Sequence, residues 1–215
     1  MMKLCFKFAL YLVLAIGVSA GRAGAYEDFF KAIPFDDARS IDSLLARGFD
    51  PNARDDKGQT PLILSLREGS FKVAASLLGQ PQTRLDLANA SGETALMMAA
   101  LKGHTDWMQR LLDKGARLEN PAPPGWTALH YAASGPEPRT LALLLARGAQ
   151  VDARSPNGTT ALMMAARYGP EDAVQALLQK GADPRLRNDL GLGAADFARQ
   201  AGRETLSATL AQLAR

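Results

Sequence analysis

The chain has 215 residues, with 25 Lys and Arg side chains against 22 Asp and Glu and a formal net charge of +3. This near balance gives no reason to expect a nucleic acid or an anionic membrane as a partner. The one cysteine, Cys5, excludes a disulfide framework and the cysteine-rich metal sites. A chain of this length and composition must therefore rest on a packed hydrophobic core.

The beginning of the chain differs from the rest. Two lysines precede an apolar run from Phe8 to Val18, and two small-x-small sequences follow, ending at Ala20 and Ala25. This order of features is typical of a cleaved signal peptide, and the run is short for a membrane span. We predict a signal peptide over 1–25, with cleavage after Ala25 and with Ala20 as the second choice. A retained N-terminal anchor is the alternative.

The next segment, 26–54, predicts a pair of helices at about Glu27–Ile33 and Asp37–Arg47. Ile41 and Leu44 recur there at the spacing of one buried helical face. The segment lacks the phrase that opens every later unit, so it is expected to cap the N-terminal end of the fold.

A Thr-Pro/Ala-Leu phrase then recurs at Thr60, Thr94, Thr127 and Thr160, at separations of 34, 33 and 33 residues. A threonine before a helix accepts a hydrogen bond from the first helical turn, so each copy predicts a helix start. Self-similarity at this period indicates stacked units that bury their apolar faces only against neighbours. The predicted units after the leader are 26–54, 55–88, 89–120, 121–154, 155–187 and 188–215, the first and last being caps.

The fourth of these units, 121–154, is irregular. Three prolines within 120–124 stiffen the hairpin before Gly125 and remove backbone donors. Pro136 stands where the neighbouring units have Gly103 and Gly169. We therefore predict that the first helix of this unit ends one residue early.

The repeated residues resemble a known family. Gly-x-Thr-Pro/Ala-Leu-x-x-Ala-Ala, a Gly-His and a Leu-Leu-x-x-Gly-Ala-Asp are similar to the ankyrin repeat, most fully over Gly92–Ala116 and Gly158–Asp183. The resemblance implies a β-turn and two antiparallel helices in each repeat, and a binding role in place of a catalytic one. We predict an all-α ankyrin-repeat solenoid of about six units, including the two caps.

The resemblance also implies where a partner binds: the concave face, made of the hairpin tips and the exposed ends of the first helices. Trp126 and Tyr168 stand out there, because exposed aromatic side chains are typical interface anchors. The alternative for Trp126 is packing over the proline-rich hairpin. The predicted partner-binding residues are Lys57, Gln59, Arg67, Glu93, Lys102, Trp126, Arg167 and Tyr168.

Other chemistry finds little support. His104 and His130 occupy family positions, and the resemblance implies that His130 bonds to the backbone of a neighbouring loop. Met97, His130 and Met163 share one column of the repeats, but neighbouring helices lie about 8–10 Å apart, too far for three side chains to converge on one metal ion. The methionines and Trp107 are therefore predicted core residues, and we expect no catalytic residue, cofactor or metal.

With its leader and its lack of cysteine after the leader, the chain resembles exported bacterial ankyrin-repeat proteins. This resemblance implies a periplasmic protein that acts as a monomeric, non-enzymatic protein–protein interaction module with an unknown protein partner. A secreted effector that acts on host proteins is one alternative. An enzyme or a metal carrier built on the same scaffold is the other.

Overall fold

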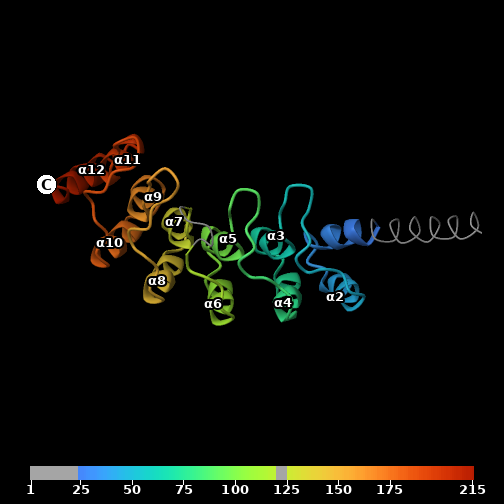
Figure 1. Ribbon diagram of the computed structural model, residues 1–215. Helices are drawn as coiled ribbons and strands as arrows, with labels where there is room; N and C mark the ends of the chain where they lie inside the picture. Colours follow the sequence, from blue (N-terminus) through green and yellow to red (C-terminus); the bar gives the residue numbers. More distant parts are fainter. Residues whose placement is uncertain (1–23, 120–124) are drawn as a thin grey trace, which may run out of the picture.

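The computed structural model describes residues 24–119 and 125–215. Within these ranges the chain forms a row of helix pairs, with α3, α5, α7, α9 and α11 in one layer and α4, α6, α8 and α10 in the layer below (Figure 1). Outside the helices and turns, the described residues contain a single isolated bridge, between Arg187 and Gly193. The predicted all-α fold class is confirmed. Most of the predicted signal peptide, 1–23, and the proline-rich segment 120–124 lie outside the described residues.

Each predicted unit contains one pair of helices. The N-terminal pair is formed by helical residues 24–32 and by α2. The bounds of the named helices are α2 Ala38–Ala46, α3 Pro61–Glu68, α4 Phe71–Gly79, α5 Ala95–Leu101, α6 Thr105–Asp113, α7 Ala128–Ser134, α8 Pro138–Ala146, α9 Ala161–Tyr168, α10 Glu171–Gln179, α11 Ala194–Gln200 and α12 Glu204–Leu213. None of the helices in the described ranges is long and apolar enough to cross a membrane.

The first helices begin at the repeated threonines. Thr60 is the N-cap of α3 and its hydroxyl accepts a hydrogen bond from the Ile63 N–H at 3.3 Å, while Pro61 takes the first helical position. Thr94 and Thr160 cap α5 and α9 in the same way. These residues satisfy backbone donors that have no partner inside the helix, which is why each helix begins where it does.

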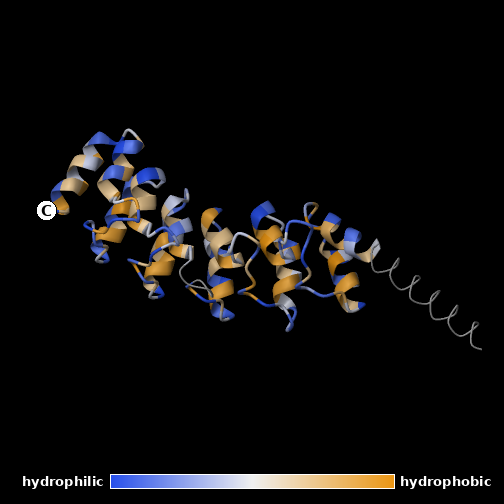
Figure 2. Cartoon of the chain, turned by 45° about the horizontal axis from the view of Figure 1, so that its top comes forward, coloured by the Kyte–Doolittle hydropathy of each residue, from blue (hydrophilic) through white to orange (hydrophobic). Residues whose placement is uncertain are grey.

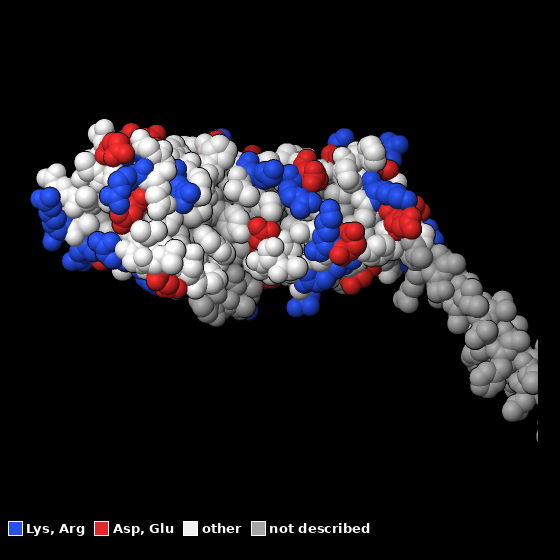
Figure 3. Space-filling view, turned by 90° about the horizontal axis from the view of Figure 1, so that it is seen from above, with Lys and Arg blue, Asp and Glu red and all other residues white. Residues whose placement is uncertain are grey.

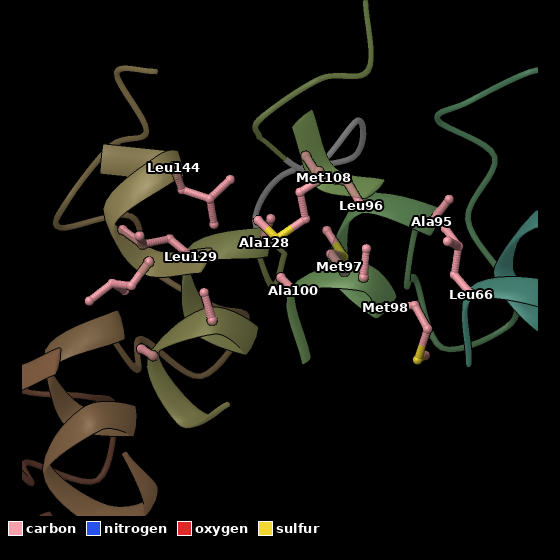
Figure 4. Close-up of a cluster of buried hydrophobic side chains, with 14 of the residues drawn as sticks. Leu66, Ala95, Leu96, Met97, Met98, Ala100, Met108, Ala128, Leu129 and Leu144 are labelled. Carbon is pink, nitrogen blue, oxygen red and sulfur yellow. The ribbon is translucent and has the colours of Figure 1, made fainter. Parts of the chain in front are cut away.

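The core lies between the two layers and between neighbouring pairs. Leu96, Leu129 and Leu162, one from each successive phrase, are each 1% exposed. Leu96 and Leu129 lie in an apolar cluster that extends through the array from Phe29 to Leu210, and Figure 4 shows the part of it between Leu66 of α3 and Leu144 of α8. Hydrophobic residues face the interior of the array, and hydrophilic residues gather at the loops (Figure 2). Trp107 is 7% exposed, so its prediction as a core residue is confirmed.

A ladder of hydrogen bonds joins consecutive hairpins. At one position of each repeat a side-chain oxygen accepts from the backbone N–H of the following repeat, at 2.8 to 3.1 Å. Because the acceptor always precedes its donor by about one repeat, the ladder sets the register between neighbours. The acceptor and donor pairs are Asn52 with Arg84, Asp86 with Arg117, Glu119 with Gln150, and Asp152 with Asp183.

The C-terminal cap is attached by an arginine. The Nη1 atom of Arg203 lies 3.0, 3.0 and 2.9 Å from the carbonyl oxygens of Ala165, Ala166 and Gly169. These carbonyls lie at the end of α9, where the last carbonyls of a helix lack the partners that interior ones have. The Ala165 oxygen also accepts from the N–H of the C-cap Gly169. A cation at a helix C-terminus also interacts favourably with the helix dipole.

The fourth repeat departs from its neighbours at the end of its first helix. Helix α7 ends at Ser134 with Gly135 as its C-cap, whereas α9 ends at Tyr168 with Gly169 as its C-cap. Counted by repeat position, α7 ends one residue earlier than α9 and level with α5. Of the two neighbouring repeats, the predicted early end therefore holds against the fifth and not against the third.

Candidate partner-binding face

The structure brings the two predicted aromatic anchors to the same place. Trp126 precedes α7 and Tyr168 ends α9, and both line one pocket of about 320 Å³ on the exposed side of the first helices. Seen from above these helices, the middle of the face carries few charged side chains, while charges gather on either side (Figure 3). The pocket is lined by Leu101, Trp126, His130, Tyr131, Ser134, Met164 and Tyr168.

Trp126 is half-buried and packs on its own repeat. Its ring lies edge-on to His130, with centroids 5.2 Å apart, and edge-on to Tyr131 at 6.4 Å. The prediction that this position faces solvent is thus only partly correct, because one side of the indole is covered. The alternative packing against the prolines concerns 120–124 and lies outside the described residues.

Tyr168 lines the pocket from the fifth repeat and is 58% exposed. The Arg167 guanidinium lies over its ring, 5.2 Å from the centroid, and Nη1 of Arg167 donates to Gln200 Oε1 at 3.1 Å. A cation over a tyrosine face is attracted by the negative face of the ring. The contact keeps a positive charge beside an exposed aromatic surface.

Glu93 and Gln59 are less available than predicted. The Nδ2 atom of Asn89 donates to Glu93 Oε2 at 2.7 Å and to Gln59 Oε1 at 3.1 Å. The Tyr131 hydroxyl donates to Glu93 Oε1 at 3.0 Å. Burial, assisted by the Glu93 carboxylate, raises the pKa of Tyr131, so the hydroxyl stays protonated as a donor. These two residues therefore help to hold neighbouring hairpins together, and their predicted part in partner binding stays a prediction.

The remaining predicted residues are separate from the pocket lining. Lys57 is exposed at a hairpin tip, and Lys102 is exposed as the C-cap of α5. Arg67 is half-buried and its Nε donates to Glu68 Oε1 at 3.1 Å, an ion pair between adjacent residues. The structure thus places five of the eight predicted residues in or next to the pocket walls: Glu93, Lys102, Trp126, Arg167 and Tyr168.

His130 carries out a structural task that links two repeats. The ring is 1% exposed, with Nδ1 3.1 Å from the Thr127 backbone N and Nε2 3.0 Å from the Thr159 carbonyl oxygen. With the proton on Nε2, the ring accepts from Thr127 and donates to the loop of the next repeat. Burial lowers the pKa of His130 because it disfavours the charged ring, and the bond to Thr159 opposes that shift. The expected bond to a neighbouring loop is confirmed.

Met97 and Met163 share this task in part, which sequence reasoning missed. Their Sδ atoms lie 3.4 Å from the backbone N of Thr94 and Thr160, the position that Nδ1 of His130 takes at Thr127. Sulfur is a weak acceptor, so these contacts add to a role that is mainly apolar filling, both residues being 1% exposed. The sequence signal for this shared role was that Met97, His130 and Met163 occupy the same position in successive repeats.

The geometry gives no metal constellation in the ranges that the structure covers. No group of three or more His, Cys, Asp or Glu side chains there could hold a metal ion. His104 is the N-cap of α6, and its ring lies edge-on to Phe71 at 4.9 Å, with its pKa lowered by burial. An array of helix pairs with an apolar pocket on one face defines a repeat protein of the binding class.

The comparisons with known proteins agree with this class. The family model for ankyrin repeats (3 copies) matches residues 29–122 and 117–188. The chain therefore belongs to the ankyrin-repeat family. Human Rabankyrin-5 is 40% identical over 62 residues, which is 29% of this chain and 5% of that protein. Mouse ankyrin repeat and SAM domain-containing protein 6 is 34% identical over 69 residues, 32% of this chain and 8% of that protein. The matched segment is thus a small part of either relative.

Among solved structures, a similar chain occurs in the complex of the Bd0816 predatory endopeptidase from Bdellovibrio bacteriovorus with immunity protein Bd3460. The TM-score is 0.72 and the identity 29%, over 86% of this chain and 97% of that chain. The likeness thus extends over most of this chain and nearly all of that chain.

Proposed function

We propose that this protein binds a protein partner across its concave face, with Trp126 and Tyr168 as the central contacts. The observation that carries the proposal is that both side chains, from neighbouring repeats, line one apolar pocket. Contacts at the centre of an interface contribute most when they fill a pocket from which water is excluded. The family is one of interaction modules, and the pocket supplies such a place.

The partner class that we propose is a hydrolase, which this protein would hold inactive. Support comes from the similar chain in a complex between an endopeptidase and its immunity protein. Of the two roles named there, the immunity role suits this chain better. Its histidines are engaged in packing and backbone bonds, and no metal-binding group occurs in the described part of the chain.

We also propose that the protein works after export, in the periplasm of a bacterium. The support is the charged, apolar and small-residue order of 1–25. The mature protein is then expected to begin at Tyr26, or at Gly21, and to fractionate with the periplasmic content. Mass analysis of the purified N-terminus checks this. An intact Met1 in the cytoplasmic fraction would contradict export, and recovery in the culture medium would favour the secreted effector.

The binding role is tested with Trp126→Ala. The protein that co-purifies with the chain from a periplasmic extract is isolated, and its Kd is measured by calorimetry. Loss of a central aromatic contact is expected to weaken binding by about 2 kcal/mol, a roughly 30-fold rise in Kd. The melting temperature should change little.

Phe35→Ala is the matched control. Phe35 is an aromatic side chain of the N-terminal cap, 84% exposed and distant in sequence from the pocket. Its loss should leave both Kd and melting unchanged. If Trp126→Ala lowers the melting temperature and leaves Kd as it was, Trp126 is only a packing residue and the concave pocket is not the binding site.

A further inference from the structure

The pocket exists because the fourth repeat lacks two side chains that its neighbours have. Two equivalent positions at the end of the first helix are occupied by Leu101 and the C-cap Lys102 in the third repeat, and by Arg167 and Tyr168 in the fifth. The fourth repeat has Ser134 and Gly135 at these positions. Large side chains therefore rise on both sides of a gap above α7, and the gap is the 320 Å³ pocket.

The neighbouring helix keeps this gap open. Gly135 is buried, and a Cβ atom built on it would lie 3.1 Å from the Ala100 carbonyl oxygen and 3.4 Å from that of Tyr131. The close approach of the end of α5 thus disfavours any side chain at this position. The Ser134 hydroxyl lies 3.0 Å from the His130 carbonyl oxygen and 3.2 Å from that of Tyr131, so it is turned back onto its own helix.

The walls are held in place before any partner arrives. The Tyr131 ring is tied to Glu93 through its hydroxyl, and the Trp126 ring rests on His130, which is itself fixed by Thr159. A site whose side chains are already ordered loses little conformational entropy on binding. Its volume lies at the lower end of the range for ligand pockets, about 300–1,000 Å³, a size that suits one large side chain.

The charges beside the pocket are unevenly compensated. Lys102, the C-cap of α5, and Arg167, in the last turn of α9, form no ion pair with any acidic residue that the structure describes. The acidic side chain nearby, Glu93, already accepts hydrogen bonds on both oxygens. The positive charges therefore remain for a partner, and they lie at the helix C-terminal side of the pocket.

We infer that the pocket anchors an exposed segment of the protein partner that carries a large apolar residue with an acidic residue close to it in sequence. The apolar side chain enters between Trp126 and Tyr168 above Ser134. The carboxylate pairs with Lys102 or Arg167, whose charges steer and orient the segment. This inference rests on the proposed function and adds the chemistry of the partner segment to it.

A displayed library of random peptides, selected against the full-length protein, tests the inference. Enriched peptides should share a Leu, Phe, Met or Trp near an Asp or Glu. They should lose at least tenfold in affinity for the Ser134→Leu variant, because leucine, the residue of position 101 in the third repeat, fills the gap. Ser134→Ala keeps the gap open and should retain binding. The double variant Lys102→Glu with Arg167→Glu should enrich Lys or Arg in place of the acidic residue.

Three results would overturn the inference: no enrichment, enriched peptides that bind Ser134→Leu as well as the wild type, or an acidic preference that survives the double charge reversal. Circular dichroism of each variant establishes that it is folded. The natural partner separates this inference from the proposed function. If that partner binds the Ser134→Leu variant with unchanged Kd but binds the Trp126→Ala variant more weakly, the concave face is still the binding site and only the pocket inference fails. If neither substitution changes the Kd of the natural partner, both the pocket inference and the proposed function fail.

Discussion

The second and third repeats end their first helices differently from the fourth and fifth. After α3, Gly69 takes a left-handed conformation with φ +78°, and Gly103 after α5 has φ +77°. After α7 and α9, Gly135 and Gly169 are extended, with φ and ψ of −79° and 163° and of −83° and 165°. All four are glycines at a helix end, but they have two backbone geometries.

The difference follows from the next residue. Pro136 and Pro170 come directly after the extended glycines, and a proline disfavours the α region for the residue before it. The extended turn brings Gly169 against the preceding repeat, where a Cβ atom would overlap the Ala133 carbonyl oxygen. A Cβ on Gly69 would meet nothing within 4 Å. Glycine is thus needed at Gly69 for its conformation and at Gly169 for its lack of volume.

The largest expected effect tests whether the second and third repeats share one core with the fourth and fifth despite this difference in backbone geometry. Leu96→Ala and Leu129→Ala should each lower the free energy of unfolding by about 2–5 kcal/mol through lost burial and a residual cavity. Both side chains are 1% exposed. Urea denaturation of the two variants measures the losses. A cost below 1 kcal/mol at one site only would show that the two pairs of repeats are packed unequally.

A pair of glycine substitutions separates conformation from volume. Gly169→Ala should cost about 1–3 kcal/mol by overpacking, and Gly69→Ala about 1–2 kcal/mol by left-handed strain. Asparagine distinguishes them, because it tolerates the left-handed region but is larger than alanine. Gly69→Asn should therefore recover part of the stability in urea denaturation, and Gly169→Asn none. Equal behaviour of the two asparagine variants would contradict the comparison.

His130→Met converts the fourth repeat to the chemistry of its neighbours. The third and fifth repeats have Met97 and Met163 in this column, so the cap contact to the Thr127 N–H should survive. The bond to the Thr159 carbonyl is lost, which should lower the free energy of unfolding by about 1 kcal/mol. The loss stays this small because the Thr159 oxygen still accepts from the Ser155 N–H at 2.9 Å. Chemical denaturation provides the measurement, and an unchanged stability would mean that the bond contributes nothing.

The smallest effect concerns pH and separates the two histidines. Burial lowers the pKa of both His130 and His104 below the ordinary 6.5. Protons then bind the unfolded chain more readily, so stability is intact above about pH 6.5 and falls as pH drops below it. Each ring can contribute at most about 1.4 kcal/mol per pH unit. Unfolding at pH 7.5 and 5.5 should show a smaller loss in His130→Met than in wild type. Identical losses would assign the pH dependence to His104 or to other groups.

Much of the fold could be predicted because its signals are local. The helix starts at Thr60, Thr94 and Thr160 depend on a hydroxyl and a backbone N–H only three residues apart. The burial of Leu129 follows from helical spacing within one repeat. Such features need no knowledge of neighbours beyond the period, which the sequence shows directly.

The candidate site was predicted less completely, because its properties depend on contacts between repeats. Trp126 and Tyr168 stood out by type and position, but the pocket between them comes from the small size of Ser134 and Gly135. An absent side chain becomes a cavity only when larger neighbours stand on both sides. Comparing the repeats column by column is the signal that could have found it.

The sequence by itself determined the number and period of the units, the helix starts and the buried face of each helix, since these rest on short-range hydrogen bonding and periodicity. Tertiary structure alone decided that Asn89 bonds to Gln59 of the preceding repeat and that the fourth repeat opens a pocket. These contacts join residues about 30 positions apart or enclose space between repeats. Their formation depends on how closely neighbouring helices approach, a distance that no single repeat encodes.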